Sequence, residues 1–219
     1  MKINRCFLLM LFFCLFWFYG CEERPNTNTE KYLKLHGIVN GQEKEIKIGK
    51  LVFFIPPEID IQVETYGEIN KGEADILRFD LDFSHLVTGW SGLTSKVRVV
   101  VRALEEESVS RQQEISVSHD TRLEGERMYF GLIEQPTDDP PGGWSFKKYI
   151  VPLEDDNPTI GNMVFNCSGR PETGVSECWG GYKRGMADIW LFLSGRLLPN
   201  WRQVILETDK KIEFMIRDR

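Results

Sequence analysis

The sequence predicts an α+β fold that is strand-rich, with an antiparallel sheet and a C-terminal amphipathic helix packed on it. Two observations lead to this prediction. Most of the chain beyond residue 30 alternates apolar and polar residues with a period of two, which is typical of strands with one buried face. The last segment instead spaces its apolar residues by three and four, which is typical of a helix. The composition, 42% hydrophobic and 27% charged, suits a globular protein.

The clearest predicted strand is 77–83, which places four apolar side chains on one face and Arg78, Asp80 and Asp82 on the other. A first hairpin is expected from strands at 32–39 and 43–48, because Asn40-Gly41 is a strong turn signal. The other expected strands are 51–55, 96–104, 114–119, 127–133, 144–151, 163–166, 178–183 and 187–193, the last two joined by a turn at Arg184-Gly185.

The C-terminal helix is expected to begin near Pro199, because proline suits the first helical turn. Glu207 and Lys211 form a favourable pair four residues apart. The apolar stripe is expected to pack on a sheet rather than to bind a partner. Its members are Trp201, Val204, Ile205, Thr208, Ile212, Met215 and Ile216.

The amino terminus predicts export. Lys2 and Arg5 precede an uninterrupted apolar run at 6–19. This run has the length of a signal-peptide core and is shorter than the ~20 residues that span a bilayer as a helix. An uncleaved signal anchor is the alternative.

Residues 18–21 resemble a bacterial lipobox, in which a small residue precedes a cysteine that becomes lipidated. Phe18 stands where that motif usually has leucine. The resemblance implies cleavage before Cys21 and a palmitate-type acyl anchor on it, and Glu22 implies the outer membrane of a Gram-negative cell. We therefore expect a signal peptide at 1–20, a lipidated cysteine and tether at 21–30, and a single periplasmic domain at 31–219, with a subdivision near 155–160 as the alternative.

The cysteines agree with export. Of five, Cys6 and Cys14 leave with the signal peptide and Cys21 takes the lipid, which leaves Cys167 and Cys178. Because the periplasm is oxidising, a disulfide between them is expected, closing a stapled loop. Free thiols or half of a metal site are the alternatives.

The acidic balance, a net charge of −6, excludes nucleic acid as the expected partner and suits a basic protein. Solubility alone is the other explanation. Partner contacts are expected in loops rather than on the sheet, above all in 136–144 with Asp138, Asp139 and Trp144, and in the loop between the two cysteines.

The motifs of common chemistries are missing. His36, His85 and His119 have no metal-ligand spacing, and Ser91 lacks the second glycine of a nucleophile elbow, where Leu93 stands. We therefore expect no enzyme activity, no cofactor and no metal site.

Two segments resemble lipase-immunity lipoproteins of type VI secretion systems. They are 48–57 (IGKLVFFIPP) and 189–201 (IWLFLSGRLLPNW) followed by the helix, with paired cysteines before the second segment. The chain lacks a cysteine before Gly49. The resemblance implies a membrane-anchored immunity protein that binds and neutralises a toxic lipase, a secreted phospholipase, without identifying contact residues. A structural or assembly lipoprotein of the cell envelope is the alternative, and a lipid- or small-ligand-binding domain ranks third.

Overall fold

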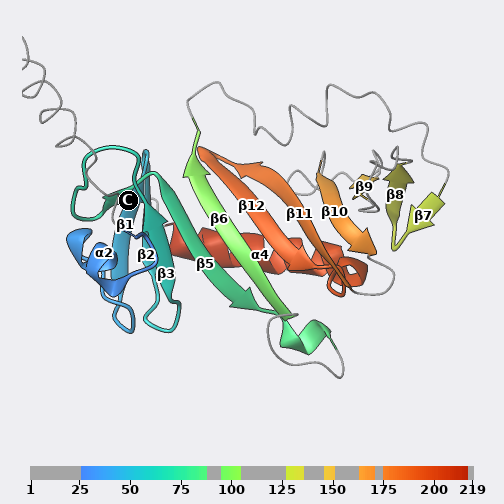
Figure 1. The fold of residues 1–219 in the computed structure, drawn as a ribbon, viewed down its shortest axis with the longest axis horizontal. Coiled ribbons are helices and arrows are strands. Elements are labelled where there is room, and N and C mark those ends of the chain that lie inside the picture. The colour runs from blue at the N-terminus through green and yellow to red at the C-terminus, as the bar shows by residue number, and fades with distance from the viewer. Residues whose placement is uncertain are drawn as a thin grey trace, which may run out of the picture.

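The computed structural model describes residues 26–87, 95–104, 127–135, 146–150, 163–170 and 175–216. These residues form a large antiparallel sheet, a small sheet and a C-terminal helix that crosses behind the large sheet in Figure 1. The fold is therefore α+β, as the sequence predicts.

Nine of the described strands form the large sheet, in the order β3-β5-β6-β12-β11-β10-β9-β8-β7, and every pairing is antiparallel. The sheet consists of two runs of neighbouring strands that meet where β6 pairs with β12 (Figure 1). The strands are β3 (Ile61–Glu64), β5 (Ile76–Asp82), β6 (Lys96–Ala103), β7 (Arg127–Tyr129), β8 (Leu132–Gln135), β9 (Phe146–Ile150), β10 (Val164–Arg170), β11 (Val175–Arg184) and β12 (Ala187–Ser194).

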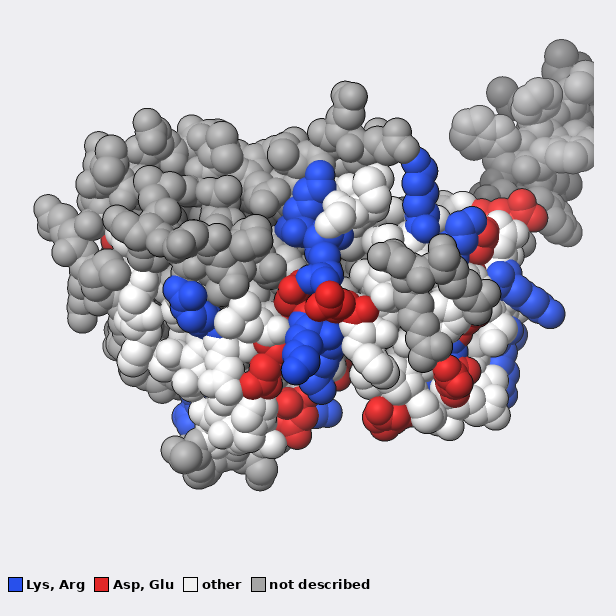
Figure 2. Space-filling model, turned by 180° about the vertical axis from the view of Figure 1, so that it is seen from behind, with Lys and Arg blue, Asp and Glu red and all other residues white. Residues whose placement is uncertain are grey.

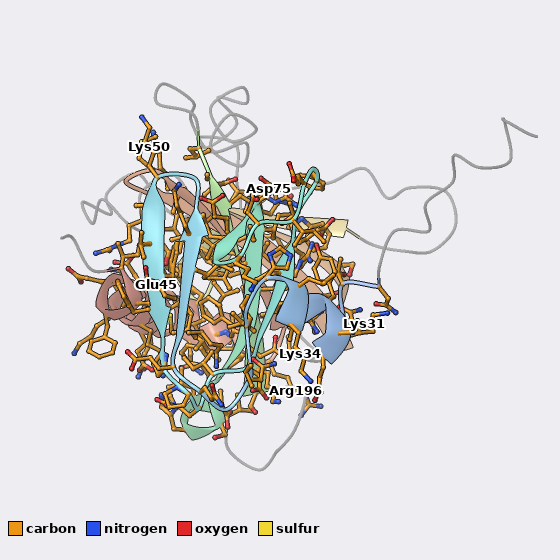
Figure 3. All side chains as sticks on the ribbon, turned by 90° about the vertical axis from the view of Figure 1, so that its left-hand side faces the viewer. Lys31, Lys34, Glu45, Lys50, Asp75 and Arg196 are labelled. Carbon is orange, nitrogen blue, oxygen red and sulfur yellow. A yellow bond between two sulfur atoms is a disulfide. The ribbon has the colours of Figure 1, made fainter. Side chains whose placement is uncertain are left out.

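The small sheet has the order β2-β1-β4, from β1 (Lys44–Ile48), β2 (Leu51–Ile55) and β4 (Glu73–Ala74). β1 and β2 form a hairpin with Lys50 at its tip (Figure 3). Gly49 has φ +59°, and a Cβ there would lie 2.4 Å from the Cβ of Ala103. Only glycine therefore allows this turn to pack against the end of β6.

Helix α4 (Trp201–Met215) follows a short 3-10 turn, η5 (Leu198–Asn200), which contains Pro199. The predicted stripe is its buried face, and at its end Ile216 pairs with Phe53 of β2. The helix therefore covers one face of the large sheet and continues to the small sheet, and the buried residues of all three form one hydrophobic cluster.

One predicted strand is a helix. Residues 32–39 contain most of α2 (Glu30–Leu35), which begins where the Thr29 hydroxyl accepts a hydrogen bond from the Tyr32 N–H at 3.2 Å. The predicted turn at Asn40-Gly41 exists, but β1 pairs with β2 and not with residues before the turn. The tether predicted at 21–30 therefore runs into α2.

The single strand predicted at 127–133 is a hairpin, β7 and β8, because Phe130 (φ 49°) and Gly131 (φ 80°) turn the chain. Strands β3 and β4 were not predicted, because each is short. The strand predicted at 114–119 lies outside the described residues. The other strand predictions are confirmed, with ends shifted by a few residues.

Candidate functional site: the open face of the large sheet

The face of the large sheet opposite α4 is the surface seen in Figure 1, and we call it the open face. Strand alternation sends every second side chain there. One row of directly opposed residues crosses five neighbouring strands on this face: Asp80, Arg98, Phe192, Trp179 and Asn166. A hollow of about 740 Å³ lies over these central strands, with the first four of these residues in its lining.

Aromatic side chains occupy the middle of the open face. Trp179 and Phe192 are directly opposed on β11 and β12, and Trp190 lies two residues from Phe192 on the same side. All three are partly buried. The Trp190 indole N–H donates to Oδ2 of Asp188 at 2.7 Å, and Asp188 is itself buried. The indole is thus held in one orientation while part of its ring meets solvent.

Next to the aromatic residues, the strands β5 and β6 carry a row of charged side chains, which we call the charge ladder. Nε of Arg98 lies 3.3 Å from Oδ1 of Asp80, and both side chains are well exposed. Arg78 forms an ion pair with Glu64 on the neighbouring strand β3. Because Arg98 stands directly opposite Phe192, the hollow has a cationic side next to an aromatic side.

Asp82, at the end of this ladder, orders a turn. Its carboxylate accepts the backbone N–H of Ser84 at 2.8 Å and the hydroxyl of Ser95 at 3.1 Å. The Ser84 backbone hydrogen bond and then the Ser95 hydroxyl lower the pKa of Asp82. Asp80 and Asp82 therefore have separate partners on the wet side of the sheet.

A second hollow of about 370 Å³ adjoins the first, because the two share Arg78, Asp80, Lys96 and Arg98 in their linings. Its far side carries three exposed carboxylates, Glu30, Glu58 and Asp60. They come from the start of α2 and from the segment before β3.

The predicted disulfide between Cys167 and Cys178 is present, with both cysteines fully buried. The two residues are directly opposed on β10 and β11, with their Cα atoms 4.0 Å apart. The stapled-loop prediction is wrong for most of its length, because the residues between the cysteines continue the two paired strands; 171–174 lie outside the described residues.

The other predicted site residues, Cys21, Asp138, Asp139 and Trp144, lie outside the described part of the chain, as does His119. His36 is buried and caps the end of α2, with Nδ1 2.7 Å from the Glu73 carbonyl oxygen. His85 lies on the surface, 3.2 Å from a carboxylate oxygen of Glu207 on α4.

The open-face aromatics were missed as a site, although the sequence carries a signal for them. In β12, Ile189, Leu191 and Leu193 point to the core, while Trp190 and Phe192 between them point out. Most strands of this sheet are apolar on one face and polar on the other. A strand with apolar residues on both faces therefore indicates a second contact surface.

The opposite side of the molecule has a different character. Figure 2 shows positive and negative side chains intermingled in a band down its middle. At α4, Arg184 contacts Asp209 and lies 3.2 Å from Glu213.

Within the described ranges, no group of three or more metal-ligating side chains gathers. Over the same ranges, no helix has both the length and the apolar content needed to cross a membrane.

No protein-family model matches the chain, and no curated protein sequence matches it. Among solved structures, the chain is similar to an immunity protein of the Stenotrophomonas maltophilia type IV secretion system, with 11% sequence identity and a TM-score of 0.46. The similarity covers 81% of this chain and 94% of that one. At these values a common fold is not established.

Proposed function

We propose that this chain is an immunity-type lipoprotein that binds a toxic lipase effector through its open face and neutralises it. In this proposal Cys21 carries the lipid, and the domain stands on the periplasmic face of the outer membrane. The target class and the anchor are supported by the sequence resemblances at 18–21, 48–57 and 189–201.

The observation that carries the proposal is the aromatic and cationic hollow on the open face. Binding energy in protein interfaces concentrates in tryptophan, tyrosine and arginine side chains that are held rigidly and surrounded by polar residues. Trp179 and Arg98, which line the hollow, and Trp190, which stands beside it on β12, fit this composition. Trp190 is fixed by Asp188, which limits the entropy lost on association.

The decisive experiment deletes the gene and exposes the cells to sister cells that deliver the effector encoded beside it. Loss of survival, restored by the wild-type gene, is the expected result. Unchanged survival, together with no complex between the purified domain and that effector, would favour the structural or assembly lipoprotein.

Variants test the open face itself. Trp179→Ala/Phe192→Ala should fail to restore survival and should not bind the effector in a pull-down. The matched control is Leu206→Ala/Phe214→Ala, which removes two exposed apolar side chains of α4 on the opposite side. Equal protection by both variants would show that the open face is not the binding surface.

The anchor has its own test. Cys21→Ala should abolish labelling by a fatty-acid probe and release the protein from the membrane fraction. Equal labelling of both forms would reject lipidation at this residue.

A further inference from the structure

We infer that the open face continues into a groove with an aromatic, a cationic and an acidic zone. This groove binds an extended segment of the partner that carries an aromatic, an acidic and a basic group in that order. The inference rests on the proposed function, whose partner it describes in more detail.

The two hollows form one continuous groove. The hollow over the aromatics and the hollow beside α2 share the same four charged residues on β5 and β6. A chain that enters above Trp179 can therefore cross β12, β6 and β5 and reach α2 without leaving the recess.

The groove changes from aromatic to charged along its length. At one end lie Trp179 and Phe192. In the middle, Lys96 and Arg98 are exposed and stand opposite Asp82 and Asp80 of β5, and the Arg98 contact with Asp80 uses Nε. The residues that both hollows share are three cations and one carboxylate, so this part of the lining is cationic on balance. A guanidinium has five N–H donors, so it can also bind an incoming carboxylate.

The far end of the groove is acidic, with Glu30, Glu58 and Asp60 all exposed. Lys44 is buried close to two of them, and its amine donates to the Gln42 carbonyl oxygen at 2.9 Å. Exposed carboxylates at this end would attract basic groups of the partner and repel acidic ones.

The length of the groove gives the length of the segment. From β11 to β3 there are four strand spacings of ~4.8 Å, so the groove is roughly 19 Å long. At ~3.3 Å per residue, an extended segment of about six residues spans it. Such a segment can place one apolar, one acidic and one basic cluster in contact with the three zones.

The test uses two labelled peptides of identical composition. One has a tryptophan, then two aspartates, then two lysines, separated by glycine and serine; in the other the aspartates and lysines are exchanged. Each is made in both chain directions, because either polarity is allowed. Binding to the mature domain is measured by fluorescence anisotropy at low ionic strength.

The aromatic–acidic–basic order should bind about tenfold more tightly, since the exchange turns several attractive charge contacts into repulsive ones. Lys96→Glu/Arg98→Glu should remove or reverse this preference. The control Arg202→Glu/Lys210→Glu makes the same charge change on exposed α4 residues and should keep it. Circular dichroism checks that both variants are folded.

Equal affinity for the two orders, no binding of either at about 1 mM, or an unchanged preference in Lys96→Glu/Arg98→Glu would overturn the inference. These results are distinct from failure of the proposed function. If the peptides fail while the domain still protects cells, the effector binds elsewhere on the domain. If the peptides discriminate while deletion leaves survival unchanged, the groove stands and its partner is not a toxin.

Discussion

Removal of the disulfide by Cys167→Ala/Cys178→Ala should lower the free energy of unfolding by about 3 kcal/mol. The cysteines are 11 residues apart in sequence, so the cross-link closes a loop of about a dozen residues in the unfolded chain. The chain-entropy model assigns ~3 kcal/mol to a loop of this size. For a chain of this length, that loss lowers the melting temperature by roughly 6–12 °C.

The assay is urea unfolding of the periplasmically expressed domain, followed by tryptophan fluorescence, with and without reductant. The wild type should lose stability in reductant, while the double variant should be unaffected by it. A difference between wild type and variant below about 1 kcal/mol would refute the reasoning. It would mean that residual structure around the two cysteines already restricts the unfolded chain as strongly as the cross-link does.

Two further predictions concern α4. Ile205→Ala should lower the free energy of unfolding, measured with denaturant, by about 2–4 kcal/mol, because Ile205 is fully buried. Leu206→Ala, at the neighbouring position that is 38% exposed, should change it by less than about 0.5 kcal/mol. Similar losses in the two variants would mean that α4 is not docked as described. Burial opposes ionisation of Glu207, but hydrogen bonds from Gln203 and His85 outweigh it and lower the pKa of Glu207. The ionised carboxylate therefore stabilises the fold at pH values above the unfolded pKa of about 4.3. This contribution is lost as the pH falls through the lower pKa of the folded state. The stability difference between wild type and Glu207→Gln should therefore shrink between about pH 6 and pH 3, and a constant difference would contradict this coupling.

The sequence predicted those elements in which one periodicity dominates. Strand β5 and helix α4 each bury one side, so the apolar residues of β5 recur every two positions and those of α4 every three or four. Such spacing arises whenever one face of a strand or helix is buried. It depends little on which element covers that face.

The strand predictions failed where a helix cap or a residue with positive φ determined the local structure. Residues 32–39 include apolar residues at adjacent positions, and the Thr29 cap selects a helix there, which the pattern alone does not show. At Phe130 a positive φ divides one apparent strand into two. The number of cysteines left after export predicted the bond but gave no indication that the two cysteines stand opposite one another on paired strands.

The candidate site was the hardest part to predict, because it is assembled across strands. Arg98 and Phe192 are distant in sequence and become neighbours only through the pairing of β6 with β12. No local pattern specifies which two strands lie side by side. The sequence could therefore indicate an excess of outward aromatics on β12 but not the cation beside them.

The pairing of β6 with β12 also affects the time course of folding. Among the described strands of the large sheet, the pairs within β3-β5-β6 and within β12-β11-β10-β9-β8-β7 lie close along the chain, whereas the β6–β12 pair joins distant parts of it. Local pairings close quickly, while a contact such as Val101 with Ile189 requires closure of a long loop. Because the open-face hollow spans this junction, a chain whose two halves have formed but not joined has no complete hollow. Under the proposed function, partner binding would thus report completed folding, because the binding surface is incomplete until β12 is in place.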